Sequence, residues 1–359
     1  MLLLLLLLVV THIAAASYVQ NRLLRTNGSV SKWNCLCSQN SCAYGGSLLS
    51  PNGTTIYLID AAGTVRAFPT EGHINPPHWN ATFTHQGATV WDSQFKLTHN
   101  GKLLLVAGES EESPNGSSRT MLYAVDTETG HVSWNFTVPG ASYFYFGVSR
   151  YSSDHDGTVY VSNGDMSQSD NPSAPHMVYS LRENDGALRW STKVVTTGGG
   201  GSDFGWHNTC VESMDGNSVF VPVLSFDASQ VVTLNGADGK IVRRSKSIPG
   251  PISTPTVSPD GERMFVGQDG GLVRALSTSD SSQLWTFQSL SSGNPGGGQT
   301  STTGGHLFLS NNDQGTLQAL LTSSGTIDWE LRTNSSGTGC PRMCCTSTDV
   351  SNAVWIWSH

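Results

Sequence analysis

The sequence predicts an all-β fold: a seven-bladed β-propeller of four-stranded antiparallel sheets, with eight blades as the alternative count. Three observations predict it. An eleven-residue pattern recurs at residues 124–134, 180–190, 233–243, 275–285 and 319–329. Gly is frequent at 39 residues and only 13% of residues are charged, which is typical of short strands joined by tight turns. No apolar pattern with the helical period of 3.6 residues follows residue 16.

Each copy of the pattern reads as a strand, a turn containing Gly and a second strand. The first copy ends at Trp134, and the others end at Trp190, Arg243, Trp285 and Trp329. A second hairpin precedes each copy, often with Asn-Gly or Asp-Gly at its turn, and these dipeptides supply the positive φ angles of tight hairpins. Each unit therefore has four strands. A sheet of this size cannot bury both faces alone, so the units must stack on one another.

The number of blades depends on the two ends of the chain. Six units end in Trp or Arg, the first being a degenerate one that ends at Trp79. Residues 342–346 and 354–357 read as two further strands, and residues 22–25 and 29–33 read as a hairpin turning at Asn27-Gly28. We therefore expect both termini to share the last blade, because such closure removes exposed sheet edges.

The first 16 residues are a nearly continuous apolar run that ends in three alanines. This pattern predicts a signal peptide at residues 1–16, cleaved before Ser17, with an uncleaved anchor as the alternative. Residues 17–359 are then one propeller domain with no membrane span. Six Asn-x-Ser/Thr sequons favour a secreted or lumenal glycoprotein; they lie at Asn27, Asn52, Asn80, Asn115, Asn135 and Asn334.

Seven cysteines follow the apolar run, and an oxidising compartment favours disulfides. Three candidates lie near each end of the chain: Cys35, Cys37 and Cys42, and Cys340, Cys344 and Cys345. Their spacing matches no standard zinc site. Since the two ends are expected to share a blade, we predict at least one bond between these groups. Separate terminal peptides in non-reducing mass mapping would contradict it.

Charge and motifs argue against several functions. The net charge of −8 is spread along the chain without a basic run, so we expect no nucleic-acid partner. Residues 154–157 contain Asp and His but occupy a hairpin-turn position, so no metal site is expected. Neither Gly-x-Ser-x-Gly nor His-Glu-x-x-His occurs, so no catalytic residue is assigned. We expect a monomer.

The motif Ala-x-Asp-x-x-Thr-Gly-x-x-x-Trp at residues 124–134 resembles the tryptophan-docking motif of the quinoprotein, or pyrroloquinoline-quinone-like, β-propeller repeats. The resemblance covers essentially all of the chain after the signal. It implies that four tryptophans are structural and pack between blades: Trp134, Trp190, Trp285 and Trp329. Arg243 departs from the motif, which predicts a weaker blade junction unless Arg replaces the indole.

Some members of that family are dehydrogenases that oxidise alcohols or aldoses with pyrroloquinoline quinone (PQQ) and Ca²⁺. Several have a disulfide between adjacent cysteines against the quinone, so the resemblance makes Cys344 and Cys345 candidate PQQ contacts. The alternative is that these cysteines pair separately where the two termini meet. Because the chain is short and lacks long insertions, we expect no cofactor. The expected role is non-catalytic binding or scaffolding toward a protein or carbohydrate ligand, with a PQQ- and Ca²⁺-dependent dehydrogenase as the alternative.

Overall fold

The structure is a computed structural model. It describes residues 7–9, 18–24, 30–36, 47–59, 63–70, 76–83, 95–98, 100–109, 120–137, 145–148, 157–162, 176–194, 210–223, 228–290, 298–301, 303–311, 316–332 and 356–358. In residues 7–9, 18–24, 30–36, 145–148 and 356–358 the structure describes the backbone strands and their pairing. All regular structure in these ranges is β-strand. The described part contains no helix long and apolar enough to cross a membrane.

The first of two units comprises Met1–Thr137 and Gly337–His359. Two four-stranded antiparallel sheets lie in it. One consists of β4 (Ser47–Leu49), β5 (Thr55–Ile59), β6 (Thr64–Pro69) and β7 (Trp79–Thr82). The other consists of β8 (Phe95–Leu97), β9 (Leu103–Glu109), β10 (Thr120–Asp126) and β11 (Val132–Thr137). The apolar core between them contains Tyr57, Val65, Leu104, Val106 and Val125.

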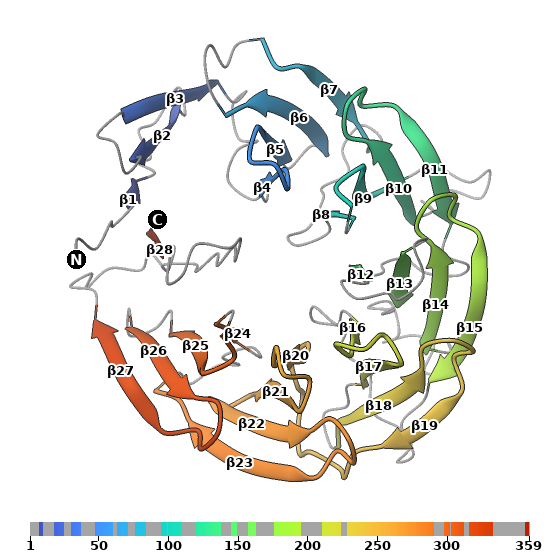
Figure 1. Cartoon of the computed structure of the whole chain (residues 1–359), viewed down its shortest axis with the longest axis vertical. Helices are drawn as coiled ribbons and strands as arrows, with labels where there is room; N and C mark the ends of the chain where they lie inside the picture. Colours follow the sequence, from blue (N-terminus) through green and yellow to red (C-terminus); the bar gives the residue numbers. More distant parts are fainter. Residues whose placement is uncertain are drawn as a thin grey trace. The chain divides into compact units, whose positions relative to one another are not determined.

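The second unit, Val138–Ser336, contains four more such sheets among its described residues. They are β12 (Tyr145–Val148), β13 (Thr158–Ser162), β14 (His176–Arg182) and β15 (Leu188–Val194); β16 (Val211–Glu212), β17 (Ser218–Val223), β18 (Gln230–Asn235) and β19 (Ile241–Arg244); β20 (Thr256–Val257), β21 (Arg263–Gln268), β22 (Leu272–Ser277) and β23 (Gln283–Gln288); and β24 (Gln299–Thr300), β25 (His306–Asn311), β26 (Thr316–Leu321) and β27 (Ile327–Arg332). Within this unit the sheets follow one another, and β15, β19, β23 and β27 are the outer strands (Figure 1).

The core of the second unit lies between neighbouring sheets. Val219, Val221 and Leu234 pack with Trp190 of the preceding sheet. Phe220, Met264 and Ile252 form the next cluster, and Phe265, Leu307 and Leu309 form the one after. The central strands are buried on both faces, which is why their patterns read as apolar runs rather than as strict alternation. These six four-stranded sheets confirm the all-β propeller class and the two-hairpin reading of each unit.

The same β-bulge occurs in the last strand pair of five sheets, between Ala124 and Val125 and at the equivalent places. A bulge places two residues opposite one and re-aims the side chains beyond it. Next to the bulge, a small residue of the third strand lies opposite the tryptophan of the fourth strand. The pairs are Ala124 with Trp134, Ser180 with Trp190, Ala275 with Trp285 and Ala319 with Trp329. The pair β6–β7 lacks the shift, in keeping with the degenerate first unit.

The chain ends form two small sheets in the described part of the first unit. The predicted N-terminal hairpin is present as β2 (Tyr18–Leu24) and β3 (Val30–Leu36). Residues 354–357 were expected to share its sheet. Instead, β28 (Ile356–Ser358) pairs in parallel with β1 (Leu7–Val9), within the predicted signal peptide. Residues 342–346 lie outside the described residues, so the shared blade and the count of seven stay predictions.

Candidate interaction surface

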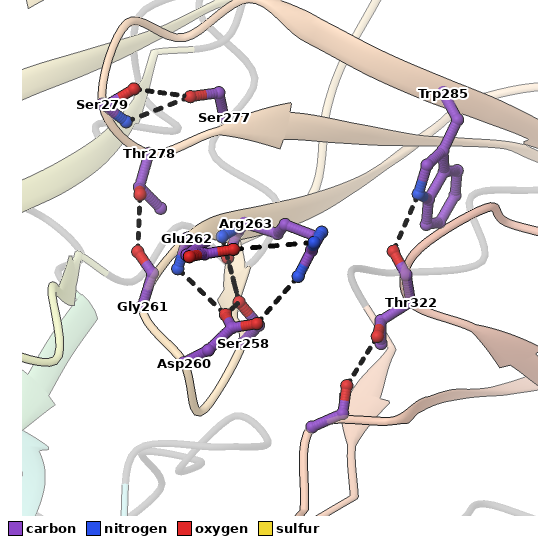
Figure 2. A network of polar contacts seen from close by, with 11 residues as sticks. Ser258, Asp260, Gly261, Glu262, Arg263, Ser277, Thr278, Ser279, Trp285 and Thr322 are labelled. Carbon is purple, nitrogen blue, oxygen red and sulfur yellow. Dashed lines mark hydrogen bonds and ion pairs between the residues drawn. The ribbon is translucent and has the colours of Figure 1, made fainter.

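A hydroxyl residue organises the first turn, between the first and second strands, in the five sheets whose first turn is described. Ser258 Oγ lies 2.5 Å from Asp260 Oδ1, to which it donates, and accepts the Arg263 N–H at 3.0 Å (Figure 2). Equivalent bonds join Ser50 to Asn52, Thr98 to Asn100 and Ser213 to Asp215, at 2.7, 3.0 and 2.6 Å. The Ser213 hydroxyl, followed by the Asn217 N–H, lowers the pKa of Asp215. The turns are therefore held by side chains that the sequence marks as Ser/Thr-x-Asp/Asn-Gly.

In three sheets a threonine links the turn between the third and fourth strands to the first turn. Thr278 Oγ1 donates to the Gly261 carbonyl at 2.5 Å (Figure 2), and Thr322 Oγ1 donates to the Gly304 carbonyl at 2.5 Å. Thr127 makes the same bond to Gly101 at 2.9 Å. In each case Thr is the first residue after the third strand. The backbone carbonyl of this residue is thereby fixed in place.

The backbone carbonyl of the first residue after the third strand accepts a hydrogen bond from the tryptophan of the preceding sheet. The indole N–H groups of Trp79, Trp190 and Trp285 donate to the carbonyls of Thr127, Gly236 and Thr322, at 3.0, 2.9 and 2.9 Å. Figure 2 shows the bond from Trp285 to Thr322. Each ring also packs on an aromatic residue of its own sheet, Tyr57, Tyr160 or Phe265, with centroids 6.0, 5.9 and 5.6 Å apart. The docking tryptophan therefore joins two sheets by packing and by one hydrogen bond.

The glycine in the turn between the third and fourth strands leaves room for the indole of the preceding sheet. Gly130, Gly239 and Gly325 have φ of 75°, 71° and 72°. A Cβ on them would come within 2.7, 2.4 and 2.5 Å of a ring carbon of Trp79, Trp190 and Trp285, respectively. Two requirements thus select glycine here: the left-handed backbone and the close approach of a ring from the preceding sheet.

Arg243 stands where the other copies have Trp, and the next sheet also departs from the pattern at the position that it contacts. Arg243 Nη2 donates to the carbonyl of Thr278, the same position that accepts the indole N–H elsewhere. The glycine position of that turn holds Ser281, the one non-Gly residue with positive φ among the described residues, at 60°. Ser281 Oγ accepts the Arg243 Nε–H at 3.3 Å. Arg243 therefore replaces the indole donor, and Ser281 provides a second acceptor where no indole needs the space.

We predict that these two exceptions are energetically coupled. Arg243→Trp alone should destabilise the protein by about 1–3 kcal/mol, because the indole meets the Ser281 side chain. Adding Ser281→Gly should recover stability, with a coupling free energy of about 0.5–3 kcal/mol. Urea unfolding of both single variants and the double variant measures this. Strictly additive changes would contradict the pairing.

A buried polar cluster joins the first two sheets of the second unit. The Tyr160 hydroxyl on β13 lies 3.4 Å from Glu212 Oε1 on β16, to which it donates. Tyr160, Glu212 and Cys210 are all buried. Burial, followed by the Glu212 charge and hydrogen bond and by Cys210, raises the pKa of Tyr160 above its usual value. The phenol therefore stays protonated, as a donor to the carboxylate of the neighbouring sheet.

This cluster predicts a loss of stability at alkaline pH. The Tyr160 pKa is raised in the folded state, so its contribution is fully present below the unfolded pKa of about 10 and is lost as pH rises above it. Tyr160→Phe removes this term. Compared with the wild type, the variant should gain about 1 kcal/mol between pH 8 and pH 10.5–11, measured by urea unfolding. A constant difference between the two proteins over this range would contradict the assignment.

The outer strands of the second unit expose apolar side chains to solvent. We call this set the outer rim: Leu188 on β15, Ile241 and Val242 on β19, Leu284 on β23, and Ile327 and Leu331 on β27. Leu188 is 54% exposed and Val242 is 55% exposed. Each of these strands is last in its sheet, with no strand beyond it among the described residues. Unpaired edges with apolar side chains are a common basis for protein recognition.

The tryptophans of the repeated pattern differ in their exposure. Trp134 and Trp190 are both 8% exposed, and Trp285 is half-buried. Trp329 is 38% exposed and packs on Phe308 with ring centroids 5.9 Å apart. The predicted PQQ contacts Cys344 and Cys345 lie outside the described residues, as do Cys37, Cys42 and Cys340. Cys35 lies in β3, of which only the backbone is described.

Three of the predicted glycosylation sites are exposed: Asn52, Asn80 and Asn135. Asn27, Asn115 and Asn334 lie outside the described residues. No group of three or more His, Cys, Asp or Glu side chains suited to a metal occurs in the described part of the chain.

The eleven-residue pattern does not identify two parts of the docking arrangement: Trp79, and the groups of the following repeat that each tryptophan contacts. Trp79 docks like the others, but a longer turn hides the spacing that identifies them. The acceptor carbonyl and the turn glycine lie in the following repeat, 46 to 51 residues downstream for Trp190 and for Trp79. A search that pairs each Trp with the Gly of the next copy, and Arg243 with Ser281, would have found them.

Comparisons with known proteins agree with this architecture. The family model described as outer membrane protein assembly factor BamB matches residues 175–357, just over half of the chain. Comparison with curated proteins gives no match to this chain. Among solved structures, the crystal structure of BamB from Moraxella catarrhalis is similar with a TM-score of 0.57 at 15% identity. The match covers 94% of this chain and 90% of that one.

A second similar structure is the β-propeller domain of Cps50 (Swd1) from Myceliophteria thermophila. Its TM-score is 0.54 at 12% identity, covering 82% of this chain and 88% of that chain. At such identities the likeness concerns the fold alone. Both neighbours nevertheless share the architecture of repeated sheets described above.

Proposed function

The chain belongs to the family described as outer membrane protein assembly factor BamB, a family of PQQ-like β-propeller repeats, and from this premise we propose that it is a non-catalytic module that binds or scaffolds other proteins. The outer rim is the observation that carries the proposal. Its apolar side chains recur on four successive outer strands, on a framework of docked sheets. A rigid frame presenting exposed apolar edges suits protein binding.

The use of polar side chains in the described repeats supports the same conclusion. Ser258, Asp260, Thr278 and Thr322 hydrogen-bond to turns and neighbouring sheets. The buried phenol of Tyr160 donates to Glu212 between two sheets. These groups hold the framework together, which leaves the exposed faces of the sheets for recognition.

We also propose that the protein is exported through the secretory pathway and glycosylated. The apolar segment at residues 1–16 and the exposed sequons at Asn52, Asn80 and Asn135 support this. Expression in a eukaryotic secretory host should yield protein that begins at Ser17 and loses mass on treatment with peptide-N-glycosidase. Retention inside the cell without glycan would contradict export.

The alternative, a quinone- and Ca²⁺-dependent dehydrogenase, is tested directly. The full chain is incubated with PQQ and Ca²⁺, desalted, and assayed for quinone absorbance and for dye-linked oxidation of alcohols and aldoses. We expect neither retained quinone nor turnover. Stoichiometric quinone with oxidation would overturn the non-catalytic role.

A photo-crosslinking residue placed at Val242 in the native cell tests the binding role. Thr129, which is exposed in the turn before β11 of the first unit, is the matched control position. We expect a defined protein adduct at Val242 and none at Thr129. The absence of an adduct at each outer-rim position would contradict this role.

A further inference from the structure

A basic stretch lies on one outer strand of this acidic chain. Residues 240–246 contain Lys240, Arg243, Arg244 and Lys246, four of the 19 Lys and Arg residues. This stretch is an exception to the even spread of charge along the rest of the chain. β19, the last strand of its sheet, lies within this stretch, and Lys240 and Lys246 flank it.

The equivalent windows of the other repeats are different. The seven residues after the turn position of Gly239 carry a net charge of +4, whereas those after Gly130, Gly186, Ser281 and Gly325 carry 0, +2, 0 and −1. Lys240 pairs with Asp238 at 2.6 Å, which offsets one charge. Arg243 bonds to the uncharged groups of Thr278 and Ser281, so its positive charge is not neutralised there. The concentration of charge is a property of this edge rather than of the repeat.

The same edge is suited to pairing with an extended chain. Ile241 and Val242 are 41% and 55% exposed, and β-branched residues favour strand pairing. Charged edge strands normally discourage self-association. A basic edge repels a second basic strand but attracts an acidic one, so the same charges reject one partner and select another. The neutral β23 has no such charges, which argues against general edge protection.

We propose that β19 binds an extended acidic segment of a partner protein by adding it as a further strand of the sheet β16–β19. The backbone of the partner segment pairs with the open edge of β19. Its acidic side chains lie along Arg244 and Lys246, and its alternate apolar side chains pack near Ile241 and Val242. This inference rests on the proposed binding function and names its surface and the class of its partner.

Fluorescence anisotropy with two labelled decapeptides tests the proposal. One alternates Val and Glu, and the other has the same sequence with alternate backbone nitrogens methylated, which keeps the charge but prevents strand pairing. We expect saturable binding of the first peptide at 50 mM NaCl and at least tenfold weaker binding of the second. Equal binding of the two would overturn strand addition, and no binding of the first would overturn the proposal entirely.

Two variants of equal charge change locate the site. Arg244→Gln with Lys246→Gln removes two positive charges, one at the end of β19 and one two residues beyond it. Thr286→Glu with Gln288→Glu adds two negative charges at the equivalent positions of β23. The first pair should weaken binding of the Val-Glu peptide at least tenfold and the second pair less than twofold. Equal weakening would show that only overall charge matters and would overturn the assignment.

Other partners give different outcomes. Vesicles containing 30% phosphatidylserine should not bind at these protein concentrations, and sedimentation should show a monomer. Vesicle binding or self-association that the β19 variant abolishes, without peptide binding, would replace the proposal. Failure here leaves the non-catalytic role intact, because quinone retention and turnover test that role separately.

Discussion

Replacing Trp190 with Ala is expected to lower the free energy of unfolding by about 3–5 kcal/mol. The side chain is 8% exposed, and its ring packs between two sheets of the second unit with Val221 and Leu234. A buried indole removes roughly 150–250 Å² from water. Its loss also leaves the Gly236 carbonyl without the indole donor, which lies at 2.9 Å. Urea unfolding followed by far-ultraviolet circular dichroism measures the change.

Leu188 is the matched control for this prediction. It lies two residues earlier on the same strand and is 54% exposed. Leu188→Ala should therefore change the free energy of unfolding by no more than about 0.5 kcal/mol. A loss for Trp190→Ala no larger than that for Leu188→Ala would refute the docking role.

Gly239→Ala should destabilise the protein by about 2–5 kcal/mol. Placing Ala at φ of 71° costs about 1–2 kcal/mol. The added Cβ would also lie 2.4 Å from Trp190 Cε3 and 2.7 Å from Thr192 Oγ1. Moving a hydrogen-bonded ring in a packed core adds about 1–3 kcal/mol. The same urea titration detects the sum of the two effects.

Gly250 separates these two effects. Its φ is 72°, but no atom lies within 4 Å of a Cβ built on it. Gly250→Ala should therefore show the backbone strain alone, about 1–2 kcal/mol. If Gly239→Ala costs no more than Gly250→Ala, the indole does not require the glycine.

The sequence predicts the repeating sheets well because their signals are local. The bulged hairpin that ends at Trp134 lies within eleven consecutive residues, and its turn is fixed by Gly130. Trp134 and Trp190, which end two of these copies, are each 8% exposed. Turn chemistry and apolar periodicity both act over a few residues, so one repeat contains all the information that specifies its own four strands.

The contacts between sheets are harder to predict, because their partners lie in different repeats. Nothing within residues 233–243 indicates that Arg243 will meet Ser281, 38 residues away. The basic stretch that contains Arg244 and Lys246 lies at an open edge because β19 is the last strand of its sheet among the described residues. The amino-acid sequence does not give the order of the strands in a sheet. The predicted PQQ contacts Cys344 and Cys345 lie outside the described residues, so their role remains a prediction.

The dependence of each indole on the following turn has a consequence for exchanging segments between related proteins. A chimaera cut at the boundary between two sheets would separate Trp285 from the native Thr322 and Gly325. A cut just after the turn glycine keeps each such pair in one cassette: the last strand of one sheet and the first three strands of the next. The segment to exchange therefore begins one strand before each sheet begins. A segment that contains Arg243 must also contain Ser281.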